Sequence, residues 1–178
     1  MKNTQTRTRS MVLAAVLAAA TAILAQIMLP IGPVPFNLAL LGVFLAGCLL
    51  PVGWAVASIA VYVLLGVFGI PVFAGFSGGP AVLAGPTGGY IVGYLFVALL
   101  SALAVRSGKL AVSALGMIAG LIVCYALGTG WFMIATGRGL GESLMLCVVP
   151  FLLPDLAKGA LALLVSRAVK ARLGVSAG

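Results

Sequence analysis

The sequence predicts an all-α integral membrane protein in which six transmembrane helices form one bundle. Of its 178 residues, 63% are hydrophobic and only 7% are charged. A soluble domain carries about 25% charged residues, which cover its surface. Long apolar runs are separated by short breaks, and a spanning helix needs about 20 largely apolar residues. The length suits a single domain over residues 1–178.

The six predicted spans cover about residues 10–29, 36–51, 53–69, 88–105, 110–135 and 148–168. The first follows a basic stretch, as a signal peptide would. It is long for a signal, and further spans follow, so we expect a retained helix. Residues 51–53 (PVG) predict a tight turn, and GTGW at 128–131 indicates that the fifth span bends or ends early.

Basic residues predict the orientation. Eight of the ten lie before the first span, between the fourth and fifth spans, or after the last: Lys2, Arg7, Arg9, Arg106, Lys109, Arg167, Lys170 and Arg172. An even number of spans places these segments on one side, which the positive-inside rule makes cytoplasmic. We therefore expect a bacterial plasma (inner) membrane protein with both termini inside. The formal charge of +8 comes without a basic patch interleaved with aromatics, so we expect no nucleic-acid partner.

Several kinds of chemistry are disfavoured. Cys48, Cys124 and Cys147 are scattered and the chain has no histidine, so we expect no metal site. GFSGG at 75–79 matches the G-x-S-x-G nucleophile motif, but its usual histidine base is missing. No P-loop motif is present, so the chain is not expected to bind ATP that way. We expect a protein that is not an enzyme and needs no cofactor.

Asp155 and Lys158 are the strongest candidates for a ligand site. They are three residues apart, hence neighbours on one helical face. Lys158 precedes Arg167 by nine residues, about 13 Å along a helix, which places the pair within the membrane. Charges at that depth usually face a cavity and serve function. The alternative is a mutually neutralising pair that only holds two helices together.

The glycine-rich stretch, GIPVFAGFSGGPAVLAGPTGGY at 69–90, has seven glycines, three prolines and no charge. Such a segment cannot form one regular helix. Irregular backbone near membrane depth must be buried by protein or line a watery cavity. We expect a lid over a cavity at the outer face, between the third and fourth spans. An ordinary extracellular loop is the alternative, although such loops normally carry charge.

Small residues recur every four positions in the first span, at Ala14, Ala18 and Ala22, with Ala15 and Ala19 alongside. Such stripes let helices approach closely in lipid. Composition alone leaves open whether this stripe contacts the chain's own helices or a partner subunit.

Three segments of the sequence resemble those of a known protein family. In chain order these are PVPFNLALLGVFLAG, GIPVFAGFSGGPAVLAGPTGGYIVGY and PDLAK, and together they resemble the BioY family. The resemblance covers nearly the whole chain. It implies the biotin-specific substrate-binding (S) component of an energy-coupling factor transporter, which captures biotin at the extracellular face. It also implies partners, namely a transmembrane coupling subunit and ATPase subunits that use ATP. The Ala14, Ala18 and Ala22 stripe is then expected to meet the coupling subunit.

The resemblance carries Tyr90, Asp155 and Lys158 over as biotin contacts. The ureido ring offers two N–H donors and a carbonyl, which suit Asp155, Asn37 and groups of the glycine-rich stretch. The remaining expected contacts are Phe36 and Phe73 as apolar walls, and Gly75, Ser77, Gly85 and Thr87 from the stretch. Whether Lys158 or a loop group takes the carboxylate stays open. Pro154, where the family commonly has glycine, is expected to start or kink the last helix.

Two other functions remain open at this point. The same architecture could capture another small solute. The chain could instead be a self-sufficient secondary transporter or channel with Asp155 as a proton carrier, although the internal repeats that would favour this are not evident.

Overall fold

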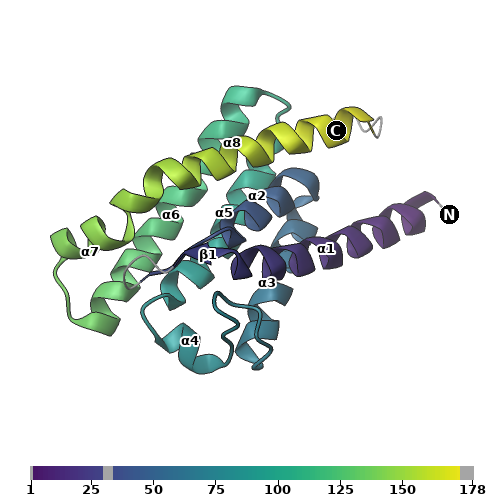
Figure 1. The fold of residues 1–178 in the computed structure, drawn as a ribbon. Helices are drawn as coiled ribbons and strands as arrows, with labels where there is room; N and C mark the ends of the chain where they lie inside the picture. Colours follow the sequence, from purple (N-terminus) through teal and green to yellow (C-terminus); the bar gives the residue numbers. More distant parts are fainter. Residues whose placement is uncertain (1, 30–33, 173–178) are drawn as a thin grey trace.

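The computed structural model describes residues 2–29 and 34–172, and within these the chain is predominantly helical (Figure 1). The helices are α1 (Lys2–Gln26), α2 (Ala39–Leu49), α3 (Val52–Val67), α4 (Pro80–Ala84), α5 (Gly88–Val105), α6 (Leu110–Thr136), α7 (Leu140–Cys147) and α8 (Val149–Arg172). Two short strands, β1 (Met28–Leu29) and β2 (Phe36–Asn37), pair antiparallel. In Figure 1 the helix ends nearest the two termini lie on the same side of the bundle.

Helix α2 lies at the centre of the bundle and contacts α1, α3, α5 and α8. Its sequence is apolar all round, as expected of a helix that is surrounded by others. Gly42 and Gly47 make the close approach possible. A Cβ at Gly42 would meet Thr21 Oγ1 at 2.5 Å, and one at Gly47 would meet Ser101 Cβ at 2.6 Å. The two glycines therefore set how near α1 and α5 come to α2.

Each of the six predicted apolar segments contains a helix, but their lengths differ. Among the described residues, four helical segments are long and apolar enough to cross a membrane: Gln5–Gln26, Gly88–Val105, Leu110–Thr136 and Val149–Arg172. Helices α2 and α3 are shorter. The 11 residues of α2 rise about 16 Å, against a hydrocarbon core of about 30 Å. The structure thus establishes the helices, while six complete crossings remain a proposal.

The first two predicted spans have different boundaries in the structure. Helix α1 begins at Lys2 rather than near residue 10, and it ends at Gln26, before β1. Because Phe36 and Asn37 pair with Leu29 and Met28 as β2, the second helix starts at Ala39 and not at 36. This ladder is a small departure from an all-α fold. Residues 30–33 of the segment between the strands lie outside the described residues.

The predicted turn at 51–53 is confirmed, because α2 ends at Leu49 and α3 begins at Val52. The fifth span was predicted to bend or to end early, and the early end is wrong: α6 continues through GTGW to Thr136. Pro154 does not start the last helix either, since α8 begins at Val149 and runs through it. The glycine-rich stretch includes one short helix, α4, with proline in its first turn.

The alanine stripe on α1 faces the chain's own helices, which corrects the expectation of a partner surface. Ala14 and Ala18 are 6% and 4% exposed and belong to the core. The carbonyl of Ala14 accepts a 2.7 Å hydrogen bond from Ser58 Oγ of α3. Ala22 is half-buried against the same core. The small side chains allow this internal contact, whereas Ala15 and Ala19 are the exposed alanines alongside.

Candidate ligand-binding cavity

A cavity of about 330 Å³ lies between the glycine-rich stretch, the segment around β2, and helices α3, α5, α6 and α8. This volume falls at the lower end of the range for small-molecule sites, about 300–1,000 Å³. Its lining consists of Val34, Pro35, Asn37, Leu40, Tyr62, Phe73, Ala74, Ser77, Val82, Pro86, Thr87, Tyr90, Ile91, Tyr94, Cys124, Tyr125, Cys147, Phe151, Asp155 and Lys158. The walls are mostly apolar, and one buried ion pair supplies the charge.

Asp155 and Lys158 form this pair on α8. Lys158 Nζ is 2.7 Å from Asp155 Oδ1. Both residues are buried: Lys158 is 7% exposed and Asp155 is 5% exposed. The ammonium also donates to the backbone carbonyl of Asn37 at 2.7 Å. It lies 4.1 Å from the centre of the Phe36 ring, within cation–π range. Lys158 therefore ties α8 to β2, and Asp155 neutralises its charge.

Tyr125 completes the arrangement from α6. Its hydroxyl donates to the second carboxylate oxygen of Asp155, Oδ2, at 2.7 Å. A buried carboxylate needs such donors because it is separated from water. Sequence reasoning missed Tyr125. A sequence signal was available: the chain has only four tyrosines, at 62, 90, 94 and 125, and each falls within a predicted apolar span. All four line the cavity.

Tyr90 lies at the start of α5, where glycines let two helices meet closely. A Cβ at Gly128 would lie 2.2 Å from the Tyr90 ring, and one at Gly89 would lie 2.5 Å from Trp131 Cβ. The Tyr90 hydroxyl shares a 3.1 Å hydrogen bond with Thr129. GPTGGY and GTGW are therefore two sides of one contact between α5 and α6, which positions the Tyr90 ring at the cavity.

Phe73 anchors the glycine-rich stretch beside the cavity. It is 1% exposed, and its ring packs edge-on against Tyr62 with centroids 5.6 Å apart. The ring fills a notch at Gly66 of α3, where a Cβ would come within 2.1 Å of it. Phe73 and Ser77 exchange backbone hydrogen bonds of 3.0 and 3.3 Å. Both residues line the cavity as a result.

Seven of the ten predicted ligand contacts line the cavity: Asn37, Phe73, Ser77, Thr87, Tyr90, Asp155 and Lys158. The other three lie next to it. Phe36 stacks on Phe151 and covers Lys158. Gly75 has φ +70° and faces Met28, and the Gly85 carbonyl accepts a 2.9 Å hydrogen bond from Trp131 Nε1. These three shape and support the cavity wall.

Cys147, at the end of α7, gives the cavity a thiol. Burial raises the pKa of this thiol, so it remains protonated and neutral at pH 7. A neutral cysteine behaves as a small apolar side chain. It therefore extends the apolar wall and does not add a second charge.

A buried polar centre within an apolar cavity, enclosed by long apolar helices, defines the class as a membrane protein that binds a small solute. Comparison with known proteins agrees. The BioY family model matches residues 1–175, and the chain belongs to the BioY family. Relatives that match the chain are named as biotin transporters, which are transport proteins and not enzymes.

Two of the relatives resemble the chain over most of their length. A probable biotin transporter BioY of Pyrococcus horikoshii is 41% identical over 154 residues, which cover 86% of this chain and 91% of that protein. The biotin transporter BioY of Thermotoga maritima is 36% identical over 163 residues, 91% of this chain and 96% of that one. A solved structure, the S-component for biotin from an ECF-type ABC transporter, superposes with a TM-score of 0.87 at 27% identity. That match covers 96% of this chain and 95% of the other.

Proposed function

We propose that the chain is the substrate-binding subunit of an ATP-driven vitamin uptake transporter and that it captures biotin. Relatives named as biotin transporters and the structural match to a biotin S-component support the proposal. The observation that carries it is the Asp155–Lys158 pair with Tyr125, because its hydrogen-bonding pattern suits a cyclic urea.

The pair offers both kinds of group that a ureido ring requires. The carboxylate of Asp155 can accept hydrogen bonds from ring N–H groups. Lys158 uses two of its three N–H groups on Asp155 and Asn37, so the third can donate to the ring carbonyl. The aromatic and aliphatic walls suit the thioether ring and the valeryl chain. A ligand without the donors and acceptor of a cyclic urea would leave these buried polar groups without partners and would therefore bind poorly. The pair thus also confers specificity.

The carboxylate of biotin is proposed to lie away from the ion pair. Lys158 is already neutralised by Asp155, and a second carboxylate nearby would be repelled by the first. Ser77 and Thr87, where the glycine-rich stretch lines the cavity, offer hydroxyl and backbone donors instead. We therefore assign the ureido ring to α8 and the carboxylate to the glycine-rich stretch, which acts as a lid.

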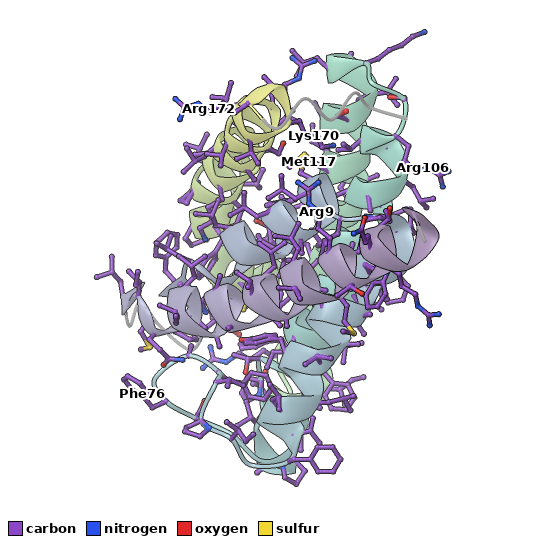
Figure 2. The ribbon with its side chains drawn as sticks, turned by 90° about the vertical axis from the view of Figure 1, so that its right-hand side faces the viewer. Arg9, Phe76, Arg106, Met117, Lys170 and Arg172 are labelled. Carbon is purple, nitrogen blue, oxygen red and sulfur yellow. The ribbon has the colours of Figure 1, made fainter. Side chains whose placement is uncertain are left out.

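Capture is proposed to occur at the extracellular face, with six crossings and both termini cytoplasmic in a bacterial plasma membrane. The positions of the basic residues support this orientation. Arg9, Arg106 and Lys170 line one groove, the basic groove, which includes the ends of α2 and α5 and the beginning of α3. Figure 2 shows these three residues well separated from Phe76 of the glycine-rich stretch.

Energy is proposed to come from a coupling subunit and from ATPase subunits that bind ATP. Because the Ala14–Ala18 face of α1 is buried, docking would use the exposed face instead. Ala15 and Ala19 lie there, beside the exposed Val12 and Val16. Small side chains on a lipid-facing surface favour close contact with another helix.

The direct test is a titration of the purified chain in detergent with biotin, biotin methyl ester and riboflavin. We expect biotin to bind saturably and riboflavin not to bind. The methyl ester should bind more weakly, because it removes the carboxylate, yet still depend on Asp155. Tight binding of riboflavin without biotin would assign the cavity to another solute and overturn the proposal. Uptake into vesicles that contain only this chain would indicate a self-sufficient transporter.

A further inference from the structure

The last residue of α1, Gln26, contacts the glycine-rich stretch through both ends of its side-chain amide. Nε2 donates to the carbonyls of Val72 and Phe73, each at 3.2 Å. Oε1 accepts a 2.9 Å hydrogen bond from the backbone N–H of Phe76. One side chain thus reaches three backbone groups within the 72–77 turn. Nε2 also donates to Ala22 of its own helix at 3.0 Å, which fixes the direction of the amide.

The 72–77 turn needs such support because its backbone is strained. Gly75 has φ +70° and Phe76 has φ +54°, and Phe76 is the one described residue other than glycine with positive φ. That region is unfavourable for residues with a Cβ. The Phe76 side chain is 72% exposed and projects from the turn (Figure 2), so its packing offsets little of this strain. The hydrogen bond to Gln26 gives the backbone N–H of Phe76 an acceptor in this unfavourable conformation.

The position of this turn decides the shape of one cavity wall. Phe73, Ala74 and Ser77 all line the cavity, whereas Gln26 does not. Phe73 fixes one end of the turn in the notch at Gly66. The tip at Gly75 and Phe76 is held from the other side by Gln26.

We propose that Gln26 is a positioning residue that holds the 72–77 turn over the cavity and thereby slows the escape of bound ligand. The proposal rests on the proposed function in that the ligand is taken to be biotin. The hold on the turn itself requires no ligand. Release of biotin requires the turn to move, so loss of the contacts should act mainly on the dissociation rate.

The test compares Gln26→Met with Gln5→Met in the full-length protein. Methionine has a similar length to glutamine but offers no amide, and Gln5 is an exposed residue at the opposite end of α1. In Gln26→Met, hydrogen exchange of the 72–77 amides should speed up in the ligand-free protein, while exchange in α5 and α6 stays unchanged. The dissociation rate of labelled biotin should rise about tenfold. The association rate should change less than threefold, and Gln5→Met should match the wild type.

Gln26→Glu sharpens the test. A carboxylate keeps the acceptor for Phe76 but replaces the donor with an oxygen that faces the carbonyls of Val72 and Phe73. We expect exchange and dissociation at least as fast as in Gln26→Met. Wild-type rates in Gln26→Glu would show that the hydrogen bonds from Nε2 to Val72 and Phe73 do not hold the turn.

Unchanged exchange at 72–77 in Gln26→Met would overturn the proposal, as would faster exchange without faster dissociation. Faster exchange throughout the bundle would assign Gln26 a general role in stability and would overturn it too. If the wild type binds no biotin, the proposed function fails, and the exchange measurement alone then decides whether Gln26 holds the turn.

Discussion

The two ends of the bundle accommodate charge in opposite ways. At the cavity end, Asp155 pairs with Lys158, and Glu142 pairs with Arg138 on the neighbouring surface. Asp155 and Glu142 are the only two acidic residues of the chain. At the other end, Arg9, Arg106 and Lys170 line the basic groove of about 740 Å³, whose described lining includes no carboxylate.

This difference follows from where each charge lies. A charge buried at membrane depth has to be paired, because removal of one partner leaves an uncompensated ion in a medium of low dielectric constant. Charges near the membrane surface are neutralised from outside, by water, salt, lipid or a partner. The cavity end is therefore polar without net charge, which suits recognition by hydrogen bonds. The basic end carries the charges on which the proposed orientation rests.

Breaking the buried pair should have the largest effect. Lys158→Ala leaves Asp155 without its cation and should weaken biotin binding by about 2–5 kcal/mol. A titration of the folded variant measures this, and Asp155→Asn tests the partner separately. The double variant Asp155→Leu/Lys158→Met should recover stability, since apolar replacement of a buried pair is often neutral, yet bind no biotin. Full affinity in either single variant would show that the pair serves only to join helices.

Tyr125→Phe tests the same end with a smaller change. It removes one hydrogen bond to a charged group, which is typically worth about 1.5–3 kcal/mol. Biotin affinity should fall by about that amount, measured by calorimetry. Tyr94→Phe is the matched control, because Tyr94 also lines the cavity, but the described tyrosine that hydrogen-bonds the Asp155 carboxylate is Tyr125. Equal losses in the two variants would mean that the contact to Asp155 has no particular role.

The buried and exposed faces of α1 can be distinguished by making the same substitution at two neighbouring positions. Ala18→Trp places a large ring in the core and should destabilise the isolated protein by about 1–3 kcal/mol. Ala19→Trp lies on the exposed face and should leave thermal stability and biotin binding intact. It should instead reduce copurification with the coupling subunit. A stable Ala18→Trp protein that still binds biotin would restore the stripe as a partner surface.

The smallest effect on binding is expected at the basic groove. Arg9→Gln combined with Arg106→Gln changes exposed charges far from the cavity, and surface changes of this kind are usually worth within about 0.5 kcal/mol. Biotin affinity should therefore change by less than about threefold in the same titration. A tenfold loss would show that the two ends are energetically coupled.

Several features could be read from the sequence because they depend on local composition. Apolar runs of spanning length predicted the helices, and the boundaries of α5 agree with the prediction of 88–105. The Asp155–Lys158 pair was predictable because a spacing of three fixes neighbours on a helix. Phe73, Ser77 and Thr87 were predicted as cavity residues from the glycine-rich stretch, which could not remain as exposed backbone in an apolar setting.

Other features were decided only by the tertiary structure. Asp155 is 30 residues from Tyr125, and Gln26 is 46 to 50 residues from its partners in the turn, so no local pattern links them. The direction of the alanine stripe was equally hidden. In a soluble helix the polar face shows which side is outside, but lipid is as apolar as the core, and α1 has small apolar residues on both faces. Packing against α2 and α3, where Ala14 meets Ser58, decides which face is buried.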